Sequence, residues 1–518
     1  MKWFQQNKLI VFLAFVKFIL PFILVGNIWE LHRDEYLYYQ QGQHLSFGFL
    51  ENPPLIGLLA SISSLFGGSV IAIKFWPALF GAITLLVTAS ITKELGGKSF
   101  AQFLASSAII LSAFMRIHFL FQPNFLDIFF WTLSAYYLLR FINSKQNIYL
   151  YFLSFALAMG MWSKYSTLFF IAAILISLVL TKHRRVINKD HFWYALLLGF
   201  VLILPNILWQ YFHRFPLWHH MQEFKETQLK YINKGDFLKD QLFMLLPVVF
   251  VWIPGFFWLL INKRYHILSY VYIAVIILLL IGSGKSYYAL GAYPMLIAAG
   301  SVWYESISLY NVWIRYTVTT LMLLIGLFFV PILLPTGTPN SMAEFNKKHR
   351  IERTGILKWE DQKNHSLQQD FADMLGWKEL SNKTEKFYNS LPIQKQIDCI
   401  ILCRSYGQAG ALKYYSNDKA FSQKVICANG SFILWIPSTI DFKDIILVEE
   451  NKNIDNGELF IHFNSKTIID SVTNTLSRQY GDKIIYFQQA DSIAVKMAKE
   501  KLNTIRSQFS RSSSLFFH

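Results

Sequence analysis

The chain has 518 residues, of which 54% are hydrophobic and 15% are charged, whereas roughly a quarter of the residues in a soluble domain are charged. A net charge of +16 could suit a nucleic-acid-binding protein, but the basic residues lie mostly at the ends of apolar segments and form no stripe with base-stacking aromatic residues. The composition therefore excludes an ordinary soluble domain and argues against nucleic acid as a partner.

Residues 1–335 consist of long apolar runs separated by short polar segments. A helix needs about 20 apolar residues to cross a hydrocarbon core of roughly 30 Å, and it satisfies its own backbone hydrogen bonds there. The first run follows Lys2 and Lys8 and lacks a small-residue cleavage site, so we expect an uncleaved first helix. About eleven spans are predicted, near 9–29, 69–92, 99–115, 124–141, 148–162, 165–181, 191–212, 240–261, 265–282, 287–304 and 312–334.

Basic residues in the short connections indicate the orientation of these helices. The positive-inside rule favours a cytoplasmic N-terminus, because alternate connections then place their basic residues inside. These residues are Lys93, Lys98, Arg140, Lys145, Lys182, Arg184, Arg185, Lys189, Lys263 and Arg264. The same orientation places the C-terminal part of the chain and four other connections outside. The four outer connections are 30–69, 116–127, 213–239 and 282–286.

After Pro335 the sequence becomes that of a soluble chain. Residues 336–341 are rich in turn-forming residues and predict a linker, so the expected domains are 1–335 and 336–518. A polar, mostly helical segment is expected over 342–392. Short strands then alternate with a helix, which predicts a small α/β domain. The expected strands lie near 397–402, 431–436, 443–449 and 458–463, and the expected helix covers 406–415.

The three cysteines, Cys399, Cys403 and Cys427, all lie in this C-terminal domain. Cys399 and Cys403 flank a predicted strand and are too far apart to form a disulfide with each other. Either could pair with Cys427, and the odd number predicts at least one free thiol. No spacing typical of a metal site is present.

Two adjacent carboxylates, Asp34 and Glu35, follow the first span in an outer connection. Such a pair could supply a general base or bind a metal. Each charge would raise the pKa of the other carboxyl toward neutrality, which suits base catalysis. The alternative is a solvated acid pair at the membrane surface.

A third acid, Glu51, stands further along the same connection. Glu51 and Asn52 precede a pair of prolines that fixes the backbone, and residues 55–66 then read as an amphipathic segment in the membrane interface. The alternative reading of Glu51 is a charge that favours the N-terminus of this segment.

Asp127 is a single acid at the outer end of an otherwise apolar helix. An ionisable group in such a place is costly and indicates a functional site with a partner. Arg116, His118 and Lys164 are the candidate partners, and a purely structural Asp–Arg pair is the alternative.

Lys285 follows a glycine in the outer connection 282–286, and Tyr287 and Tyr288 come directly after it. The segment lacks the spacing and the preceding strand of a nucleotide-binding P-loop. A lysine with two tyrosine hydroxyls at the level of the lipid headgroups can still bind a phosphate. The alternative is a lysine that extends to the membrane surface beside interfacial tyrosines.

Taken together, these segments resemble the GT-C membrane glycosyltransferases of family 39, which include the aminoarabinose-to-lipid A transferase (ArnT-like) and the protein O-mannosyltransferases. The resemblance is carried by Asp34 with Glu35, by 51–55, by Asp127 and by 285–294. The segments 163–166 and 204–210 are similar to those of the ArnT-like branch of this family. Segment 406–411 is also similar to that branch, but more weakly. The resemblance covers roughly 9–300 well and the outer domain loosely.

The resemblance implies a fold and an activity. The expected fold is an all-α polytopic membrane bundle with a small extracytoplasmic α/β domain, in a multi-pass protein of the inner (plasma) membrane. The expected activity is transfer of a sugar, with inversion, from a polyprenyl-phosphate donor to a lipid, glycan or protein acceptor. Asp34 is the implied base, while Glu51 and Asp127 shape the site and Lys285 with Tyr288 holds the donor phosphate.

An anionic polyprenyl phosphate is already an activated leaving group, so no cofactor is expected to be obligatory, although a divalent metal stays open. Cationic and hydrogen-bonding groups would stabilise the departing phosphate. Relatives in the lipid A branch place a lysine where this chain has Asn52, so one phosphate contact is expected to come from elsewhere, with Arg116 and Lys164 as candidates.

Three other readings remain open at this point. A transporter or lipid flippase would favour paired hydropathy repeats and polar residues at the middle of the membrane, whereas the acids here cluster at the outer ends of the helices. A membrane anchor without catalytic activity would not depend on Asp34. An oligosaccharide ligase or polymerase would share the chemistry of the first reading and differ in the size of its donor.

Overall fold

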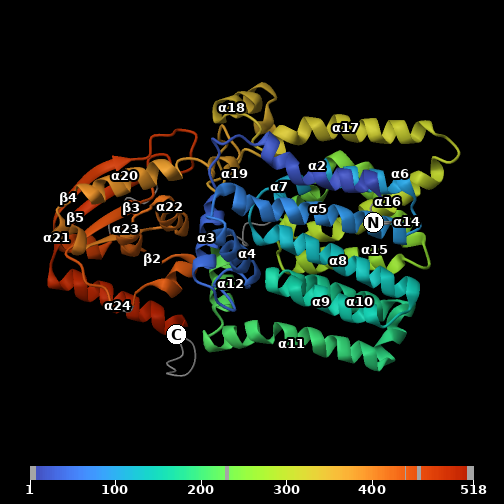
Figure 1. Cartoon of the computed structure of the whole chain (residues 1–518), viewed down its shortest axis with the longest axis horizontal. Coiled ribbons are helices and arrows are strands. Elements are labelled where there is room, and N and C mark those ends of the chain that lie inside the picture. The colour runs from blue at the N-terminus through green and yellow to red at the C-terminus, as the bar shows by residue number, and fades with distance from the viewer. Residues whose placement is uncertain (1–6, 228–232, 438, 452–456, 510–518) are drawn as a thin grey trace.

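The computed structural model describes residues 7–227, 233–437, 439–451 and 457–509. A bundle of long helices forms one part of the molecule, and a sheet with its covering helices lies at one end of that bundle (Figure 1). The short helices α3 (Arg33–Gln43) and α4 (Leu55–Leu65) lie between these two parts. The chain is therefore mostly helical with a small C-terminal sheet, as its sequence predicts.

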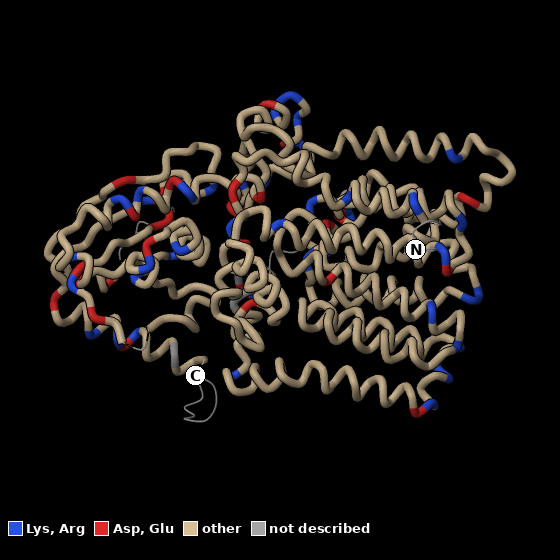
Figure 2. Tube along the Cα trace, viewed as in Figure 1, with Lys and Arg blue, Asp and Glu red and all other residues tan. Residues whose placement is uncertain are grey.

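The bundle helices are mostly apolar, so they can pack on one another and can also expose apolar side chains on the outside of the bundle. Figure 2 shows few charged residues along the middle of the bundle and more of them at its two ends and on the sheet domain. The helices are α2 (Lys8–Leu24), α5 (Val70–Glu94), α6 (Ser99–Ile110), α8 (Pro123–Ser144), α9 (Ile148–Ser163), α10 (Thr167–Leu180), α11 (Asp190–Phe212), α14 (Val249–Ile261), α15 (His266–Ile281), α16 (Tyr293–Ile307) and α17 (Trp313–Leu333).

The number of helices that are long enough to cross a membrane is smaller than expected. In the described part of the chain, four helices are long and apolar enough, or up to six if each of two bent helix pairs forms one span. The prediction of about eleven spans is therefore not supported. The reason is helix length, since segments such as α6 and α14 contain only 12 and 13 residues, whereas a straight span needs about 20.

Shorter helices connect the bundle helices at the end that faces the sheet domain. They are α7 (Phe114–Ile117), α12 (Pro216–Thr227), α13 (Lys234–Phe243) and two 3₁₀ helices, η3 (Leu246–Val248) and η4 (Ser286–Ala292), while the 3₁₀ helix η1 (Lys182–Asn188) follows α10. Gln241 of α13 donates to the carbonyl of Ser286 in η4, so α13 and η4 lie together at this end of the bundle.

The C-terminal part contains a five-stranded mixed sheet with the strand order β2-β1-β3-β5-β4. Strand β1 pairs in parallel with β2 and β3, whereas β5 pairs antiparallel with β3 and β4. The strands are β1 (Cys399–Cys403), β2 (Val425–Cys427), β3 (Asp444–Glu449), β4 (Phe463–Ser471) and β5 (Lys483–Ala490). The helices of this part are α18 (Pro339–Lys348), α19 (Gln369–Ala372), α20 (Trp377–Ser390), α21 (Ile393–Ile397), α22 (Tyr406–Tyr415), α23 (Lys419–Lys424) and α24 (Ser492–Phe509), with the 3₁₀ helix η5 (Ile351–Thr354) after α18.

Two expected strands of this domain are wrong. Residues 430–435 form the 3₁₀ helix η6 (Gly430–Trp435), and most of 458–463 forms the 3₁₀ helix η7 (Glu458–His462). Short apolar runs do not distinguish a strand from a buried helical turn, and β2 has only three residues. The helix predicted over 406–415 is confirmed as α22, and all three cysteines are buried and free.

One hydrophobic core crosses the boundary between the bundle and the sheet domain. Its buried residues come from both parts of the chain, so burial there depends on both. Tyr36 of α3, for example, packs edge-on against Trp377 of α20 and Tyr414 of α22. The sheet domain therefore holds α3 in place.

Candidate active site

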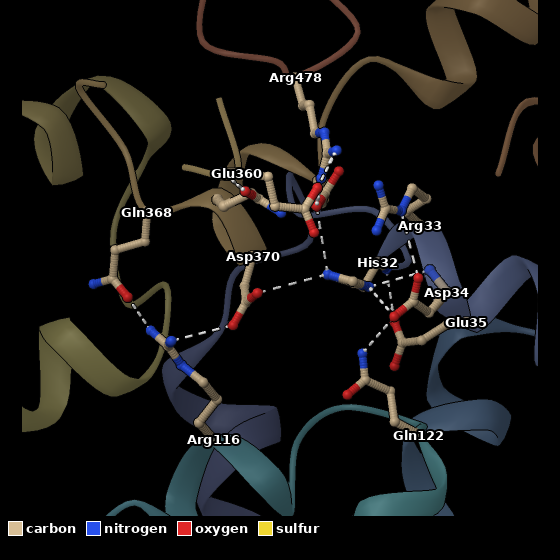
Figure 3. Close-up of polar contacts among 12 residues, drawn as sticks. His32, Arg33, Asp34, Glu35, Arg116, Gln122, Glu360, Gln368, Asp370 and Arg478 are labelled. Atoms are coloured by element: carbon tan, nitrogen blue, oxygen red, sulfur yellow. Dashed lines mark hydrogen bonds and ion pairs between the residues drawn. The ribbon is translucent and has the colours of Figure 1, made fainter. Parts of the chain in front are cut away.

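Asp34 lies in the first turn of α3, where neighbouring side chains surround its carboxylate. The Tyr406 hydroxyl donates a hydrogen bond to Oδ1 over 2.7 Å, and Arg33 Nε lies 3.4 Å from the same oxygen. The Gln122 amide donates to Oδ2 over 3.1 Å (Figure 3). The helix begins at this point because His32 is its N-cap and its ring accepts from the Asp34 backbone N–H.

These neighbours keep Asp34 ionised. Burial alone would raise the pKa of this carboxyl group, but His32, Arg33 and the hydrogen bond from Tyr406 outweigh burial and lower the pKa to about 2. The expectation that Asp34 and Glu35 raise each other's pKa is therefore wrong for Asp34. An ionised carboxylate with 24% of its side chain exposed can accept a proton or a hydrogen bond from a bound molecule.

Glu35 has a structural environment. Its buried carboxylate forms an ion pair with Lys74 of α5, with nitrogen–oxygen distances of 2.6 and 2.7 Å. It also accepts from the backbone N–H groups of His32 and Phe121. These three donor groups make four hydrogen bonds, which use the hydrogen-bonding capacity of the two oxygens. Glu35 thus joins α3 to α5 and to the turn before α8.

A chain of hydrogen bonds leads from Asp34 to Lys164. The Gln122 amide that donates to Asp34 accepts from Asn124 Nδ2 over 3.1 Å, and Asn124 Oδ1 accepts from Lys164 Nζ over 2.6 Å. Lys164 Nζ also lies 3.9 Å from the centre of the Tyr288 ring and 5.0 Å from that of Tyr287. Lys164, a candidate for the extra phosphate contact, therefore lies on both tyrosines of the predicted phosphate site, and two side-chain amides connect it to Asp34.

Asp127 lies at the same end of α8, one turn beyond Asn124. Its two oxygens accept hydrogen bonds from Ser166 Oγ over 2.7 Å and from Thr167 Oγ1 over 2.9 Å. Of the expected partners Arg116, His118 and Lys164, Lys164 interacts electrostatically with Asp127, while the hydrogen-bond donors are two hydroxyls. Asp127 thereby fixes the turn between α9 and α10, in which Lys164 lies.

Lys285 directly precedes η4 and interacts electrostatically with Asp34, Glu360 and Asp370. Burial lowers the pKa of its ammonium group, and the charges of Glu360 and Asp34 act in the opposite direction. Tyr287 interacts electrostatically with Tyr288, Tyr38 and Asp34. Lys285 and Lys164 therefore both lie near groups that surround Asp34, although they come from different connections.

Glu51 is bound by the sheet domain. Its carboxylate accepts from the backbone N–H of Ser431 over 2.6 Å, from the Ser431 hydroxyl and from Gln41 Nε2 over 3.2 Å. Burial raises the pKa of Glu51, and the hydrogen bonds from Ser431 oppose that shift. Asn52 is buried and exchanges two hydrogen bonds of 3.0 Å with Gln41.

Arg116 and His118 lie away from Asp127. Arg116 forms an ion pair of 3.1 Å with Asp370 and donates to the Ile332 carbonyl and to Gln368 (Figure 3). His118 is buried, and no hydrogen-bond partner for its ring is found among the described residues. Arg116 therefore binds the end of α17 and the segment before α19, whereas Lys164 lies beside Tyr287 and Tyr288.

A second polar cluster lies on the domain side of α3. His32 Nε2 is 3.9 Å from Asp370 and 3.8 Å from Asp373, and Arg478 forms ion pairs with Asp373 and Glu360 (Figure 3). In the described part of the chain, no group of three or more His, Cys, Asp or Glu side chains is placed to hold a metal ion.

Sequence reasoning missed several polar groups of this site. Gln122 and Asn124 flank Pro123 in an apolar context, and Tyr38 follows Asp34 by one helical turn. Tyr38 interacts electrostatically with Asp34, Tyr406, Glu51 and Tyr288. The i, i+4 spacing of Asp34 and Tyr38 could have indicated a shared helix face. Tyr406 is 372 residues from Asp34, and no local pattern could have joined the two.

Comparison with known proteins gives one family match. Residues 51–209 match the model of the family described as dolichyl-phosphate-mannose-protein mannosyltransferase. This stretch runs from Glu51 to Trp209 and contains Asp127 and Lys164. No curated protein matches this chain in sequence.

Solved structures with the same fold cover nearly the whole chain. ArnT from Cupriavidus metallidurans bound to undecaprenyl phosphate is 11% identical, with a TM-score of 0.56, and the match covers 93% of this chain and 98% of ArnT. The Archaeoglobus fulgidus oligosaccharyltransferase tethered with an acceptor peptide is 12% identical, with a TM-score of 0.50, covering 86% of this chain and 70% of that protein. The chain therefore has the fold of the GT-C glycosyltransferases, and its resemblance to them, expected from its sequence motifs, is confirmed.

Proposed function

We propose that this chain is an inverting glycosyltransferase that moves a sugar from a polyprenyl-phosphate donor to a lipid, glycan or protein acceptor. One observation carries the proposal: an ionised, partly exposed carboxylate, Asp34, is connected through two amides to a lysine that lies on two tyrosine rings. A base for the acceptor and a cation for a phosphate are thus held at a fixed separation. The fold shared with ArnT and the family match over 51–209 support this assignment.

The proposed reaction uses the two halves of the site in one displacement. The acceptor oxygen forms a bond to the anomeric carbon, the bond between that carbon and the phosphate oxygen breaks, and the acceptor proton passes to Asp34. Lys164 and Lys285, with the hydroxyls of Tyr287 and Tyr288, stabilise the charge of the departing polyprenyl phosphate. Attack opposite to the leaving group inverts the anomeric centre.

The remaining predicted residues have supporting roles in this proposal. Glu51 and Asn52 fix the connection between α3 and α4 beside the site, and Asp127 fixes the turn that presents Lys164. Glu35 and Arg116 hold elements of the site in place through Lys74 and Asp370. This scheme requires no cofactor, because the polyprenyl phosphate is itself the leaving group. The comparison with and without EDTA described below tests whether the reaction needs a divalent metal.

The proposed location is the inner (plasma) membrane, with the sheet domain and the site on the extracytoplasmic side. The site lies at the end of the bundle that faces the sheet domain. The positive-inside rule supports this orientation, because the basic connections after α5, α8 and α10 lie at the other end. The domains 1–335 and 336–518 would then lie largely within and outside the membrane.

The test is sugar transfer by the purified protein in detergent, with radiolabelled polyprenyl-phosphate sugars as donors and an envelope extract as acceptor. Asp34→Asn is compared with Asp398→Asn, because the Asp398 side chain is 25% exposed and also ion-paired but lies on the sheet domain. We expect transfer by the wild type and by Asp398→Asn, with and without EDTA, and loss of transfer in Asp34→Asn. Equal activity of both variants would remove Asp34 from the mechanism.

The absence of transfer from every donor would contradict the proposal and favour a transporter or flippase. That reading is tested by lipid-linked sugar movement in vesicles that contain the same purified protein. Loss of activity in the presence of EDTA, restored by one divalent cation, would show that the site needs a metal.

A further inference from the structure

Helix α22 of the sheet domain packs directly on α3, next to Asp34. Two glycines make this close approach possible, because they lie on the same face of α22 at a spacing of three residues. A Cβ atom on Gly407 would lie 2.5 Å from Arg33 Cγ, and one on Gly410 would lie 2.7 Å from Tyr36 Cβ. Any larger residue at either position would separate the two helices.

The contact continues through buried aromatic residues. Tyr36 is fully buried, and its hydroxyl lies 3.0 Å from that of Tyr415 at the end of α22. The Tyr36 ring packs against the rings of Trp377 and Tyr414. The position of α22 relative to α3 is therefore fixed at both ends of the contact.

Tyr406 is the first residue of α22, and its hydroxyl reaches Asp34. Ser405 and Gln408 form a capping box that fixes the start of the helix, and Asn429 accepts from the Tyr406 backbone N–H over 3.3 Å. The Arg33 guanidinium lies 5.6 Å from the centre of the Tyr406 ring. The capped helix start and the Arg33 contact thus hold the ring, and its hydroxyl donates to Asp34 Oδ1 over 2.7 Å.

The hydrogen bonds divide the roles of the two Asp34 oxygens. A carboxylate has about four lone-pair sites. Oδ1 receives Tyr406 and Arg33, whereas Oδ2 receives Gln122. Oδ2 also lies 3.9 Å from His32 Nδ1, which is beyond hydrogen-bond distance, so among the described residues one lone-pair site of Oδ2 has no hydrogen-bond donor.

We propose that Tyr406 is a positioning residue of the active site: it fixes the Asp34 carboxylate so that Oδ2 receives the proton of the acceptor, and the sheet domain thereby completes the site. This inference rests on the proposed function, since it assigns Asp34 the role of base. The C-terminal domain is then a part of the catalytic unit; the family match ends at residue 209, and the similarity of 406–411 to the ArnT-like branch gives Tyr406 no role.

The electrostatic surroundings of Asp34 make the role measurable. The titratable and charged groups that interact with Asp34 are His32, Arg33, Tyr38, Glu51, Lys285, Tyr287 and Tyr406. The Tyr406 hydrogen bond stabilises the ionised carboxylate and lowers its pKa. Loss of this one hydroxyl should therefore raise the pKa of Asp34 and free its side chain to rotate.

The test compares Tyr406→Phe with Tyr486→Phe in the full-length purified protein. Tyr486 is a matched control, because its buried hydroxyl also donates to an aspartate, Asp444, within the sheet domain. We expect Tyr406→Phe to lower kcat by about 10- to 100-fold with little change in the KM for the donor, and to move the acidic limb of the pH–rate profile to higher pH. The titration of the Asp34 carboxylate, identified by infrared bands absent in Asp34→Asn, should move in the same direction.

A second variant guards against loss of the fold in Tyr406→Phe. A 3-fluorotyrosine at position 406 keeps the shape of the ring and is a stronger hydrogen-bond donor, so it should move the acidic limb and the carboxylate titration to lower pH. Transfer by the wild type, combined with unchanged kcat, pH profile and carboxylate titration in both Tyr406 variants, would overturn the positioning role and leave the proposed function intact. A wild type that transfers no sugar would overturn the proposed function and this inference together.

Discussion

The Asp34 carboxylate and the Lys164 ammonium group are joined by two side-chain amides, those of Gln122 and Asn124, in an unbroken chain of hydrogen bonds. Each amide both donates and accepts, so the orientation of one residue sets that of the next. This chain couples the first outer connection to the turn between α9 and α10, and it passes through the start of α8.

Breaking this chain should weaken binding of the donor. In Asn124→Leu, Lys164 loses an acceptor at 2.6 Å, and we expect the KM for the donor to rise by about tenfold, equivalent to about 1.4 kcal/mol. Steady-state kinetics over a range of donor concentrations measure the change. A double variant with Lys164→Met should be no worse than Lys164→Met alone, because the two residues act as a unit.

The control for this prediction is Asn464→Leu. Asn464 donates to the Gln489 amide over 2.8 Å on the exposed surface of the sheet domain. The substitution therefore removes the same kind of hydrogen bond at a distance from the site. An equal rise in the KM for both variants would contradict the coupling between Asn124 and Lys164.

The buried pair of Glu35 and Lys74 should be important for stability. Removal of one partner leaves an uncompensated buried charge, which costs about 3–5 kcal/mol, so Lys74→Met should lower the melting temperature of the detergent-solubilised protein strongly. The double variant Glu35→Gln with Lys74→Met should recover part of that loss, because no charge is then left unpaired. Lys383→Met, which breaks a partly exposed pair with Asp470 on the sheet domain, should change the melting temperature little.

The docking of Glu51 onto the sheet domain should be sensitive to one methyl group. Gly430 has a φ of +59°, and a Cβ atom there would lie 2.5 Å from Glu51 Oε1. We expect Gly430→Ala to lower both the melting temperature and the transfer rate. Gly67→Ala isolates the backbone contribution, since Gly67 has a φ of +81° and no atom within 4 Å of its Cβ position. If both variants lose the same amount of stability, contact with Glu51 is not the cause.

The stability of the sheet domain should depend on the ionisation of Asp482. Burial raises the pKa of this carboxyl group to about 7, although hydrogen bonds from Gln408 and Asn451 oppose the shift. The folded protein then binds more protons at this site than the unfolded chain between about pH 4 and pH 7, so its free energy of unfolding should fall as the pH rises through this window. Melting temperatures measured from pH 4 to pH 8 test this, and the decline should be smaller in Asp482→Asn.

The sequence was sufficient to predict most helices and the class of fold. Long apolar runs predict buried or membrane-facing helices whatever their neighbours are, and α22 begins and ends where its pattern indicates. The number of spans was wrong because apolar length in the sequence includes residues that form loops and 3₁₀ turns, such as 286–292 ahead of α16. The strand expected at 431–436 was wrong because short apolar runs fit both a strand and a helical turn.

The candidate site could be predicted only in part. Asp34, Lys164, Lys285 and the two tyrosines were recognisable as polar groups in an apolar context. The direction of the Asp34 pKa shift was not, because it depends on His32, Arg33 and Tyr406 rather than on the adjacent acid. The partner of Glu51 could not be predicted either, since Ser431 is 380 residues away.

The contact between α3 and α22 also bears on the time at which the site is assembled. Asp34 leaves the ribosome among the first residues of the chain, but its Tyr406 hydrogen bond forms only after nearly four-fifths of the chain has been made. Because synthesis proceeds at about 5–20 residues per second, Asp34 waits for many seconds without this partner. A nascent chain that lacks α22 should therefore be inactive, and termination between α17 and α22 should yield a protein that keeps all bundle helices but transfers no sugar.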